Sequence, residues 1–401
     1  MDLRYSETYQ AFRSELRAFL KTHWPLSGAE RALAPPAQAR LFRQRATEAG
    51  YYARAVPRRY GGSEQAPDVL KAAIIAEEVA RAGAPAEVRG SGTAMLVPTL
   101  LEHGTPVQCE RFVPPTLLGD LVWCQGYSEP GAGSDLASLR TRAELRGDHW
   151  VINGQKIWTS LAHEAHWMFC LCRTEPDAPK HGGISYLLID MKTPGLEVRP
   201  LRQMTGTADF NEVFFTDVRV PKENLVGARG EGWKIANTTL KHERNMIGDA
   251  DFQRVLFESL LALARERKRG GRPAIEDLGV RQQLAEIEAE VLAQRTSMWR
   301  QMTAAARRQH PGPVVLMNKL NSTQISLRVS RLAVELLEED GLAAPGQTEH
   351  LMSAAPTGAG GWISQGMWAL GLHIGGGTAH IQRNIIAERG LGLPKDRRPP
   401  S

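Results

Sequence analysis

Apolar residues recur at helical spacing in the first part of the chain. Within Pro67–Gly83 they return every three or four positions, with a proline near the start and a glycine at the end. This punctuation is typical of a helix. The segment Ala94–Gly104 continues in the same style despite Pro98. The pattern predicts that the chain begins as a helical region.

From about Leu121 the pattern changes to short segments rich in β-branched and aromatic residues, joined by glycine and proline turns. Gly147-Asp148 is placed to turn a hairpin. The expected strands lie within Leu121–Glu129, Arg140–Trp158, His166–Thr174, Gly183–Asp190, Gly195–Arg202 and Asn211–Val220. These segments predict a small antiparallel β domain.

Helical spacing returns after Gly227, and a Gly/Ala/Pro-rich stretch near the end reads as a loop. The helical patterns cover Glu231 to about Arg269, Val280 to Arg308 and Pro313 to Asp340, the loop covers Gly341–Gly361, and a last helical segment surrounds Gly371–Arg383. We therefore predict an α+β fold with an N-terminal α-helical domain (1–119), a middle antiparallel β domain (120–227) and a C-terminal helical bundle (228–401). No GxGxxG motif follows an initial strand, which argues against a Rossmann fold.

Composition indicates an ordinary globular protein. Of 401 residues, 42% are hydrophobic and 23% are charged, and the longest apolar runs are too short to span a bilayer. Charges are spread through Met1–Leu20, unlike a secretory signal. We expect a cytoplasmic protein without membrane insertion.

Charge does not point to nucleic acid. The chain has 49 basic and 44 acidic residues, a net charge of +5, and its one dense basic run is Arg265–Arg272. Such a mild excess suits an anionic small molecule at least as well as a nucleic acid. We expect no nucleic-acid partner.

The cysteine pattern does not favour a metal or redox site. Cys109, Cys124, Cys170 and Cys172 include no CxxC pair, and strand alternation would place Cys170 and Cys172 on one face. We expect all four to be small buried core residues, and we predict no metal site.

The first candidate for binding chemistry is the loop Tyr127–Asp135, with the sequence YSEPGAGSD, directly after an expected strand. Gly131, Gly133 and Ser134 would present backbone N–H groups with little side-chain obstruction. This suits a pyrophosphate or the polar edge of a ring cofactor. A tight β-turn with incidental glycines is the alternative.

The next expected strand ends with an aromatic residue beside two hydroxyls, Trp158, Thr159 and Ser160. An aromatic plane next to hydroxyl donors suits a flat conjugated cofactor. A core tryptophan in a strand is the commoner arrangement.

A candidate base lies on the predicted helix after Gly227. Trp233, Ala236, Leu240 and Ile247 define a buried stripe, and Glu243-Arg244 falls at its edges. A carboxylate that faces a core is a stronger base than one in water, so it can act as a general base if it opens onto a cavity. The alternative is a structural ion pair with a neighbouring arginine.

Three consecutive glycines interrupt the last segment, Gly371–Arg383, GLHIGGGTAHIQR. Glycines allow a backbone to approach a ligand closely, and they also form turns between helices. The segment by itself leaves both interpretations open.

Four ordered stretches together resemble the acyl-CoA dehydrogenase family over essentially the whole chain. SEPGAGSD, at Ser128–Asp135, resembles its flavin loop, and KIWTS, at Lys156–Ser160, resembles its second flavin strand. VPKENLVG, at Val220–Gly227, with the following GEGW, resembles the start of its third domain. GTAHIQRNIIAERGLG, at Gly377–Gly392, resembles its C-terminal signature.

The resemblance implies an FAD cofactor, an acyl-CoA substrate and an electron-transfer flavoprotein or similar acceptor. It implies α,β-dehydrogenation, in which a base removes the α-proton and the β-hydrogen leaves as hydride to flavin N5. By position, the implied flavin-binding residues are Gln125, Tyr127, Ser128, Gly133, Ser134, Trp158, Thr159, Ser160, Arg267, Thr378 and His380. The implied substrate-binding residues are Ser134, Arg244 and Gly377.

The sequence departs from the family at its usual catalytic base. Most members have Tyr-Glu-Gly-Thr where this chain has Gly375–Thr378, so the glutamate is replaced by Gly376. Isovaleryl and long-chain members carry the base in a Glu-Arg pair on the long helix, at the position of Glu243-Arg244. We hypothesise that Glu243 is the base, and that the backbone N–H of Gly376 still donates to the thioester carbonyl.

A second departure lies at the Arg-x-x-Phe-Gly motif that in the family reaches the flavin of a neighbouring subunit. Arg267 is retained, but Gly270 replaces the phenylalanine, Leu278 replaces a later glutamine, and His380 stands where relatives have glutamine or glutamate. The pattern resembles bacterial members that form α₂β₂ assemblies on bulky CoA thioesters such as steroid side chains. A homodimer or homotetramer and an α₂β₂ heterotetramer both remain open.

Two other functions fit the same resemblance. A non-catalytic structural subunit of a mixed dehydrogenase would explain the missing C-terminal glutamate. An oxygen-using acyl-CoA oxidase or flavin monooxygenase would keep the fold and change the acceptor.

Overall fold

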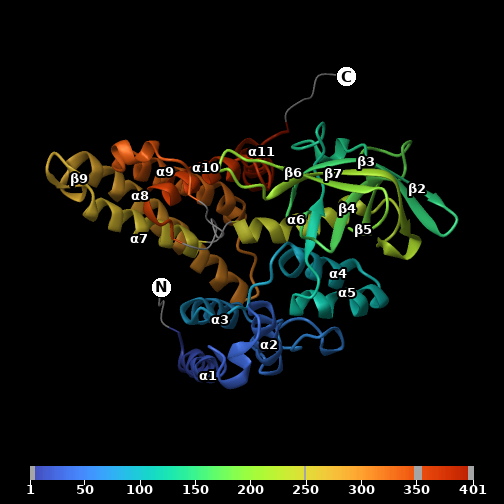
Figure 1. Ribbon diagram of the computed structural model, residues 1–401, viewed down its shortest axis with the longest axis horizontal. Helices are drawn as coiled ribbons and strands as arrows, with labels where there is room; N and C mark the ends of the chain where they lie inside the picture. Colours follow the sequence, from blue (N-terminus) through green and yellow to red (C-terminus); the bar gives the residue numbers. More distant parts are fainter. Residues whose placement is uncertain (1–4, 248–249, 347–354, 396–401) are drawn as a thin grey trace. The chain divides into compact units, whose positions relative to one another are not determined.

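The computed structural model describes residues 5–247, 250–346 and 355–395, without the side chains of residues 244–247. The chain divides into two compact units, Met1–Leu201 with Phe210–Thr239, and Arg202–Asp209 with Leu240–Ser401. The first unit holds the N-terminal helices and the sheet, and the second holds the C-terminal helices (Figure 1). The predicted α+β class is confirmed, with helical, β and helical regions in that order. The bounds of the three predicted domains stay a prediction.

The helical start of the chain is confirmed. Asp68 accepts hydrogen bonds from the amides of Leu70 and Lys71, and Gly83 ends the predicted helix with φ +61°. The second predicted segment begins as a π-turn, and Pro98 falls in the first turn of the helix that follows, where its missing N–H is not needed. The helices are α1 Glu7–His23, α2 Pro35–Glu48, α3 Val69–Ala82, α4 Val97–His103 and α5 Pro106–Leu118.

A capping box begins α5. The Thr105 hydroxyl accepts from the amide of Gln108 at 3.2 Å, and the Gln108 side-chain oxygen accepts from the amide of Thr105 at 3.0 Å. The Gln108 side chain also donates to the carbonyls of Glu223 and Leu225, at 2.8 Å each. The cap therefore joins the start of α5 to strand β8, Leu225–Val226, and to the turn that precedes it.

Loss of this cap is expected to lower stability modestly. The Thr105→Ala variant leaves the Gln108 amide without its acceptor, so the free energy of unfolding in urea should fall by about 1 kcal/mol. Thr105→Ser keeps the hydroxyl and should match the wild type. Equal stability of the alanine and serine variants would contradict a role for the cap.

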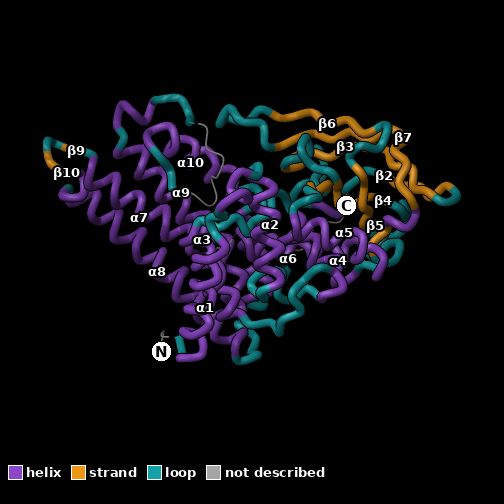
Figure 2. Tube along the Cα trace, turned by 60° about the horizontal axis from the view of Figure 1, so that its bottom comes forward, coloured by secondary structure: helices purple, strands orange, loops and turns teal. Residues whose placement is uncertain are grey.

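The sheet contains the predicted strands. They are β1 Trp123–Gly126, β2 Arg142–Arg146, β3 His149–Ser160, β4 Trp167–Arg173, β5 Ile184–Asp190, β6 Leu196–Leu201, β7 Phe210–Pro221 and β8 Leu225–Val226. Their order is β6-β7-β3-β2-β4-β5-β8, with β1 beside β4. Figure 2 shows the strands of this sheet in orange. Gly147-Asp148 turns the β2–β3 hairpin as predicted, since Arg146 pairs with His149.

The sheet is mixed, where a purely antiparallel one was predicted. Strands β1 and β2 both run parallel to β4, and the other pairs are antiparallel. A parallel pair needs a long crossover rather than a tight turn. The connection from β1 to β4 supplies one, because it contains the flavin-loop candidate and the β2–β3 hairpin.

The predicted burial of the cysteines is confirmed. Cys109 is 3% exposed, and Cys124, Cys170 and Cys172 are fully buried. Cys170 and Cys172 share one apolar cluster of the sheet, as strand alternation predicted. Burial raises the pKa of the Cys124 thiol, which favours its unreactive protonated form.

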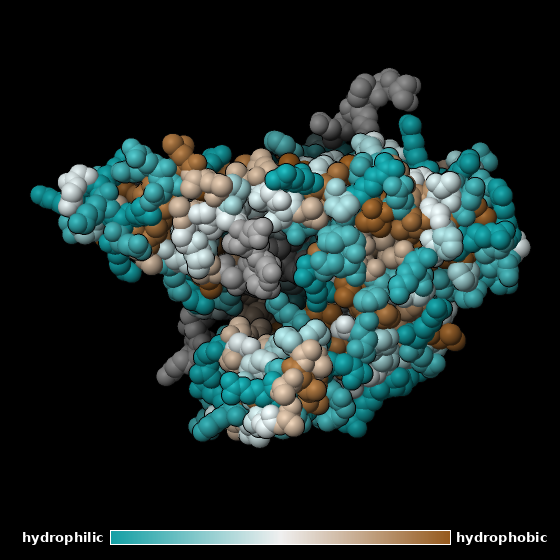
Figure 3. All heavy atoms as spheres, in the orientation of Figure 1, coloured by the Kyte–Doolittle hydropathy of each residue, from teal (hydrophilic) through white to brown (hydrophobic). Residues whose placement is uncertain are grey.

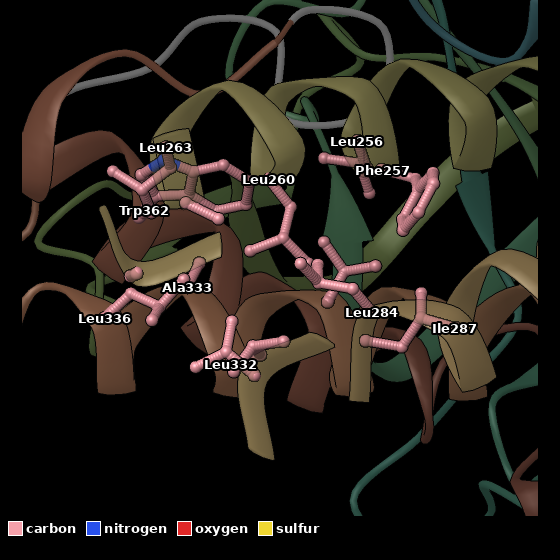
Figure 4. Packing of buried hydrophobic residues seen from close by; sticks show 14 of the residues in the cluster. Leu256, Phe257, Leu260, Leu263, Leu284, Ile287, Leu332, Ala333, Leu336 and Trp362 are labelled. Atoms are coloured by element: carbon pink, nitrogen blue, oxygen red, sulfur yellow. The ribbon is translucent and has the colours of Figure 1, made fainter. Parts of the chain in front are cut away.

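The second unit is built on helices α7 Ala250–Glu266, α8 Leu278–Ala306, α9 Asn318–Leu336 and α10 Gly358–Leu372, followed by α11 Ala379–Ile385. Helix α6, Gly232–Ile247, leads into it from the first unit. Apolar side chains of α7 to α10, among them Leu260, Leu284, Leu332 and Trp362, fill the space between these helices (Figure 4). Among the described helices, none is both long and apolar enough to cross a membrane.

Three predicted boundaries are corrected. The pattern over Glu231–Arg269 is two helices, α6 and α7, and its end is not helical. Gly358–Gly361, predicted as loop, begins α10, and Pro313–Met317, predicted as part of a long helix, is a 3₁₀ turn before α9.

The non-helical end is a short hairpin. Strand β9, Lys268–Arg269, pairs with β10, Arg272–Pro273, because Gly270 and Gly271 adopt φ +59° and +82° and form the turn. Figures 1 and 2 place the hairpin at one end of α7 and α8, and Figure 3 shows this tip as hydrophilic. The basic run Arg265–Arg272 therefore forms an exposed turn rather than only a helix end.

Candidate functional site

The loop after β1 exposes backbone amides. The amide and carbonyl of Glu129 exchange hydrogen bonds of 3.0 Å with those of Ala132, which closes a tight turn. Within the described residues, the amides of Gly133 and Ser134 have no acceptor, and both residues are exposed. A Cβ at Gly131 or Gly133 would meet nothing within 4 Å, so the approach to these amides is open. The exposure of these amides agrees with the sequence pattern, and ligand binding at the loop stays a prediction.

A buried ion pair fixes this loop to β3. Lys156 is fully buried, and its Nζ donates to Glu129 Oε1 at 2.8 Å and to the carbonyl of Tyr127 at 3.1 Å. The Glu129 carboxylate also accepts from the amides of Arg140 and Thr141, at 2.6 and 2.9 Å. Every polar atom of the Glu129 carboxylate is thus satisfied, as a buried charge requires.

The charge state of the pair follows from these contacts. Burial alone would raise the pKa of Glu129, but the charge of Lys156 and the hydrogen bonds from Lys156, Arg140 and Thr141 hold it below its usual value. Glu129 is therefore ionised at neutral pH. This anchor of the loop therefore weakens in acid, where Glu129 becomes protonated.

Trp158 lies at an irregularity of β3. The pairing of β3 with β7 shifts between Lys156 and Thr159, and Trp158 has φ +60° there. A positive φ is a strained conformation for a bulky residue, and bulges of this kind turn side chains out of a sheet. Trp158 is 59% exposed, with its ring edge-on to Phe210 at 6.1 Å between centroids. The strained backbone therefore leaves the indole ring of Trp158 exposed at the surface of the sheet.

The two hydroxyls after Trp158 point to different sides. Ser160 is exposed, like Trp158, whereas Thr159 is buried, with its carbonyl accepting from Asn211 at 2.9 Å. The Thr159 hydroxyl is buried without a partner among the described residues.

The remaining predicted residues of this loop contribute mainly backbone. The ring of Tyr127 packs edge-on against Phe169 and Tyr186 inside the core, and Tyr127 is only 4% exposed. Ser128 and Gln125 are partly buried, and the Ser128 carbonyl accepts from the amide of Ile157 at 2.9 Å. The loop and the end of β3 are thus joined into one surface of the first unit.

A second group of predicted residues lies in the second unit. Glu243 is partly buried on α6, and its charge acts on Lys319, a residue of α9 that is 2% exposed. Lys319 Nζ donates to the carbonyl of Gly377 at 2.8 Å. The side chain of Arg244 lies outside the described residues. Lys319 therefore bonds to the glycine turn and lies within electrostatic range of the candidate base.

The glycine turn leads directly into α11. Gly376 and Gly377 adopt φ +62° and +86°, which only glycine takes without strain. The Gln382 side chain donates to the carbonyl of Gly376 at 3.2 Å, and the Thr378 hydroxyl caps α11 by accepting from Ile381 at 3.2 Å. Within the described residues, the amide of Gly376 has no acceptor.

The two other predicted cofactor residues of this unit differ in environment. Arg267 forms an ion pair with Asp340 of its own chain, Nη1 to Oδ2 at 2.5 Å, so its guanidinium is already engaged. His380 is exposed on α11. His380 is therefore accessible to a cofactor as it stands, whereas Arg267 would first have to leave its ion pair with Asp340.

Sequence reasoning missed four residues that hold the two groups in place, namely Glu129, Lys156, Lys319 and Gln382. The signal for Lys156 is a lone cation inside a strand of otherwise apolar, inward-facing positions. For Lys319 it is a stripe of small polar residues on α9, Ser322, Ser326 and Ser330, which are all buried. Among the described residues, no cluster of three or more His, Cys, Asp or Glu could hold a metal ion.

Three family models match the chain in order. The acyl-CoA dehydrogenase N-terminal domain matches residues 6–120, the middle domain matches residues 124–218, and the C-terminal domain matches residues 230–391. The candidate loop and Trp158 fall in the middle region. Glu243 and the glycine turn fall in the C-terminal region.

Relatives cover nearly the whole chain. The acyl-CoA dehydrogenase IpdE1 of Mycobacterium tuberculosis is 40% identical over 365 residues, which are 89% of this chain and 88% of that protein. The solved structure titled Tcur3481-Tcur3483 steroid ACAD is 31% identical, with a TM-score of 0.78 over 99% of this chain and 100% of that one. The ChsE4-ChsE5 complex of Mycobacterium tuberculosis gives the same identity, TM-score and coverage.

Proposed function

Because the chain belongs to the acyl-CoA dehydrogenase family, we propose that it oxidises the Cα–Cβ bond of a CoA thioester with FAD as cofactor. The family is one of oxidoreductases. The observation that carries the proposal is Trp158, an exposed indole held on a strained bulge of β3. The amide of the preceding residue, Ile157, donates to the carbonyl of Ser128, in the same loop as the open amides of Gly133 and Ser134. An electron-transfer flavoprotein is the proposed acceptor.

The residues of the first unit fit a flavin. Trp158 would lie against its flat ring system, Ser160 would meet its polar edge, and the amides of Gly133 and Ser134 would donate to its oxygen atoms. FAD, when bound, supplies the acceptor for the hydrogen that leaves the β-carbon with its electron pair. The ion pair of Lys156 and Glu129 keeps the loop at a fixed position relative to Trp158.

The residues of the second unit fit the proton transfer. The Glu243 carboxylate would take the α-proton, and the Gly376 amide would donate to the thioester oxygen as negative charge develops on it. The α-proton becomes acidic only when that oxygen is stabilised, so both groups are needed together. The glycine turn retains the donor although the side chain of the usual base is absent.

We further propose a bulky acyl group and a mixed assembly. Gly375 and Gly376 leave space where most members of the family carry a tyrosine and a glutamate side chain. Two similar solved structures are the Tcur3481-Tcur3483 steroid ACAD and the ChsE4-ChsE5 complex. Arg267 is paired within its own chain, and Gly270 provides no aromatic ring for a neighbour. Both features favour a cofactor site that a second dehydrogenase-like chain completes.

An anaerobic titration tests the function. The chain is expressed alone and together with a dehydrogenase-like partner, its FAD content is measured, and short, branched and steroid-side-chain CoA thioesters are added without oxygen. We expect loss of visible flavin absorbance with a bulky thioester, and slow recovery in air. A flavin-loaded protein that no thioester reduces would indicate a structural subunit, and rapid recovery in air would indicate an oxidase or monooxygenase.

The same preparation tests the assembly. A folded, colourless chain that gains FAD only on co-expression supports the mixed assembly. One FAD per chain in the protein expressed alone contradicts it and supports a homodimer or homotetramer.

A further inference from the structure

Lys319 is a buried cation that bonds to the glycine turn. It stands at the start of α9 with 2% of its surface exposed, and the hydrogen bond described for its Nζ goes to the carbonyl of Gly377 at 2.8 Å. Burial lowers the pKa of Lys319 to about 8, while the charge of Glu243 acts to raise it. The ammonium is therefore still mostly charged at pH 7.

The carbonyl that Lys319 holds belongs to an intrinsically loose turn. Gly376 and Gly377 both have positive φ, and consecutive glycines lose more conformational freedom on folding than other residues. Side chains of two helices donate hydrogen bonds to this turn. Lys319 of α9 donates to the carbonyl of Gly377, and Gln382 of α11 donates to the carbonyl of Gly376. Two successive peptide groups are thus held, and the Gly376 amide next to them is left with few orientations.

We propose that Lys319 is a positioning residue that, by holding the Gly377 carbonyl, aims the Gly376 amide at the thioester carbonyl of the substrate. The inference rests on the proposed function. A hydrogen-bond donor stabilises developing charge best when it is oriented before the reaction. The energy needed to reorient it during the reaction would otherwise cancel the stabilisation of the transition state. The cation also places a positive charge beside the turn, which favours negative charge on a nearby oxygen.

A pair of ligands separates this role from simple stability. A 2-enoyl-CoA thioester, which is already oxidised and does not reduce the flavin, has the carbonyl, whereas the matching 2-alkenyl-CoA thioether lacks it and is otherwise the same ligand. In wild-type holoenzyme the thioester should bind more tightly than the thioether. In Lys319→Met the preference for the thioester should fall on the order of tenfold. This is less than the 10²–10³-fold effect of removing an oriented donor, because the Gly376 amide remains but is held less firmly. The dissociation constant of the thioether should stay unchanged.

Two further variants complete the design. Gln382→Leu removes the other hold on the turn and should reduce the thioester preference in the same way, so the test does not depend on one variant folding. Lys21→Met makes the same chemical change on the exposed face of α1 and should match the wild type. Equal weakening of both ligands in Lys319→Met would indicate a merely structural lysine and overturn the proposal, as would an unchanged preference in the folded variants.

The outcomes also separate this inference from the proposed function. A wild-type holoenzyme that binds neither ligand would contradict a CoA-thioester function altogether. A wild type that prefers the thioester, together with variants that keep the full preference, would contradict only the role of Lys319.

Discussion

The Glu243→Gln variant is expected to keep its FAD and to bind acyl-CoA, while kcat falls by about 10²–10⁴-fold. The side-chain amide has the size of the carboxylate but cannot accept the α-proton. Glu243 is partly buried, and its charge acts on Lys319. The rate of flavin reduction in single-turnover anaerobic mixing measures the proton-abstraction step without product release.

A structural ion pair would give a different result. If Glu243 served only to balance the buried charge of Lys319, the variant would lose thermal stability, and the enzyme that stayed folded would retain its rate. Glu258→Gln on α7 is the control, since Glu258 forms an exposed pair with Arg254 at 2.7 Å and should leave both stability and rate unchanged. Full turnover by a flavin-loaded Glu243→Gln enzyme would refute the assignment of the base.

Periodicity and punctuation predicted the elements because those signals are local. The helix α3 agrees with its pattern because Asp68 and Gly83 cap it through contacts with adjacent residues. The pattern over Glu231–Arg269 failed at its end for a related reason. Arg265–Arg269 looks like a solvated helix end, but Gly270 and Gly271 form a hairpin turn that reverses the chain.

Parts of the candidate site that depend on distant contacts could not be predicted in the same way. A lysine within a strand or helix pattern is normally an exposed residue. Lys156 is buried because the carbonyl of Tyr127 and the carboxylate of Glu129 come to it from the loop after β1. Lys319 is buried because the glycine turn returns to α9 from 58 positions further along the chain.

The bulge at Trp158 has a similar origin. The register of β3 against β7 changes between Lys156 and Thr159, and no residue type in KIWTS requires that change. The motif resemblance could place Trp158 at a flavin, whereas the strained backbone that exposes its ring is a property of the paired strands.

Lys156→Met is expected to lower the free energy of unfolding by about 3–5 kcal/mol at neutral pH, because it leaves the buried Glu129 carboxylate without its cation. Lys156 is fully buried and Glu129 is 8% exposed, so water cannot replace the lost partner. The loop should also lose its fixed position, and FAD content after purification should fall. Urea unfolding and the visible flavin spectrum measure the two effects separately.

The pH dependence of this deficit identifies its cause. In the wild type the pKa of Glu129 is lowered, so its contribution to stability is present above the ordinary glutamate value, about 4.3, and is lost as pH falls below that value. In Lys156→Met the cation is gone, so burial raises the pKa of Glu129. The loss in free energy of unfolding is therefore largest at neutral pH, where a glutamate in the unfolded chain is ionised, and becomes smaller as pH falls. The stability curves of the two proteins should therefore converge as pH falls toward 4.

Two further variants decide whether the buried charge is responsible. Adding Glu129→Gln to Lys156→Met removes the unpaired charge and should restore much of the lost stability at neutral pH. Lys234→Met, on α6, changes a lysine whose side chain is 71% exposed, and it should alter stability by less than about 0.5 kcal/mol. A Lys156→Met deficit that stays constant from neutral pH to pH 4, with no recovery in the double variant, would mean that lost packing and not the ion pair holds the loop.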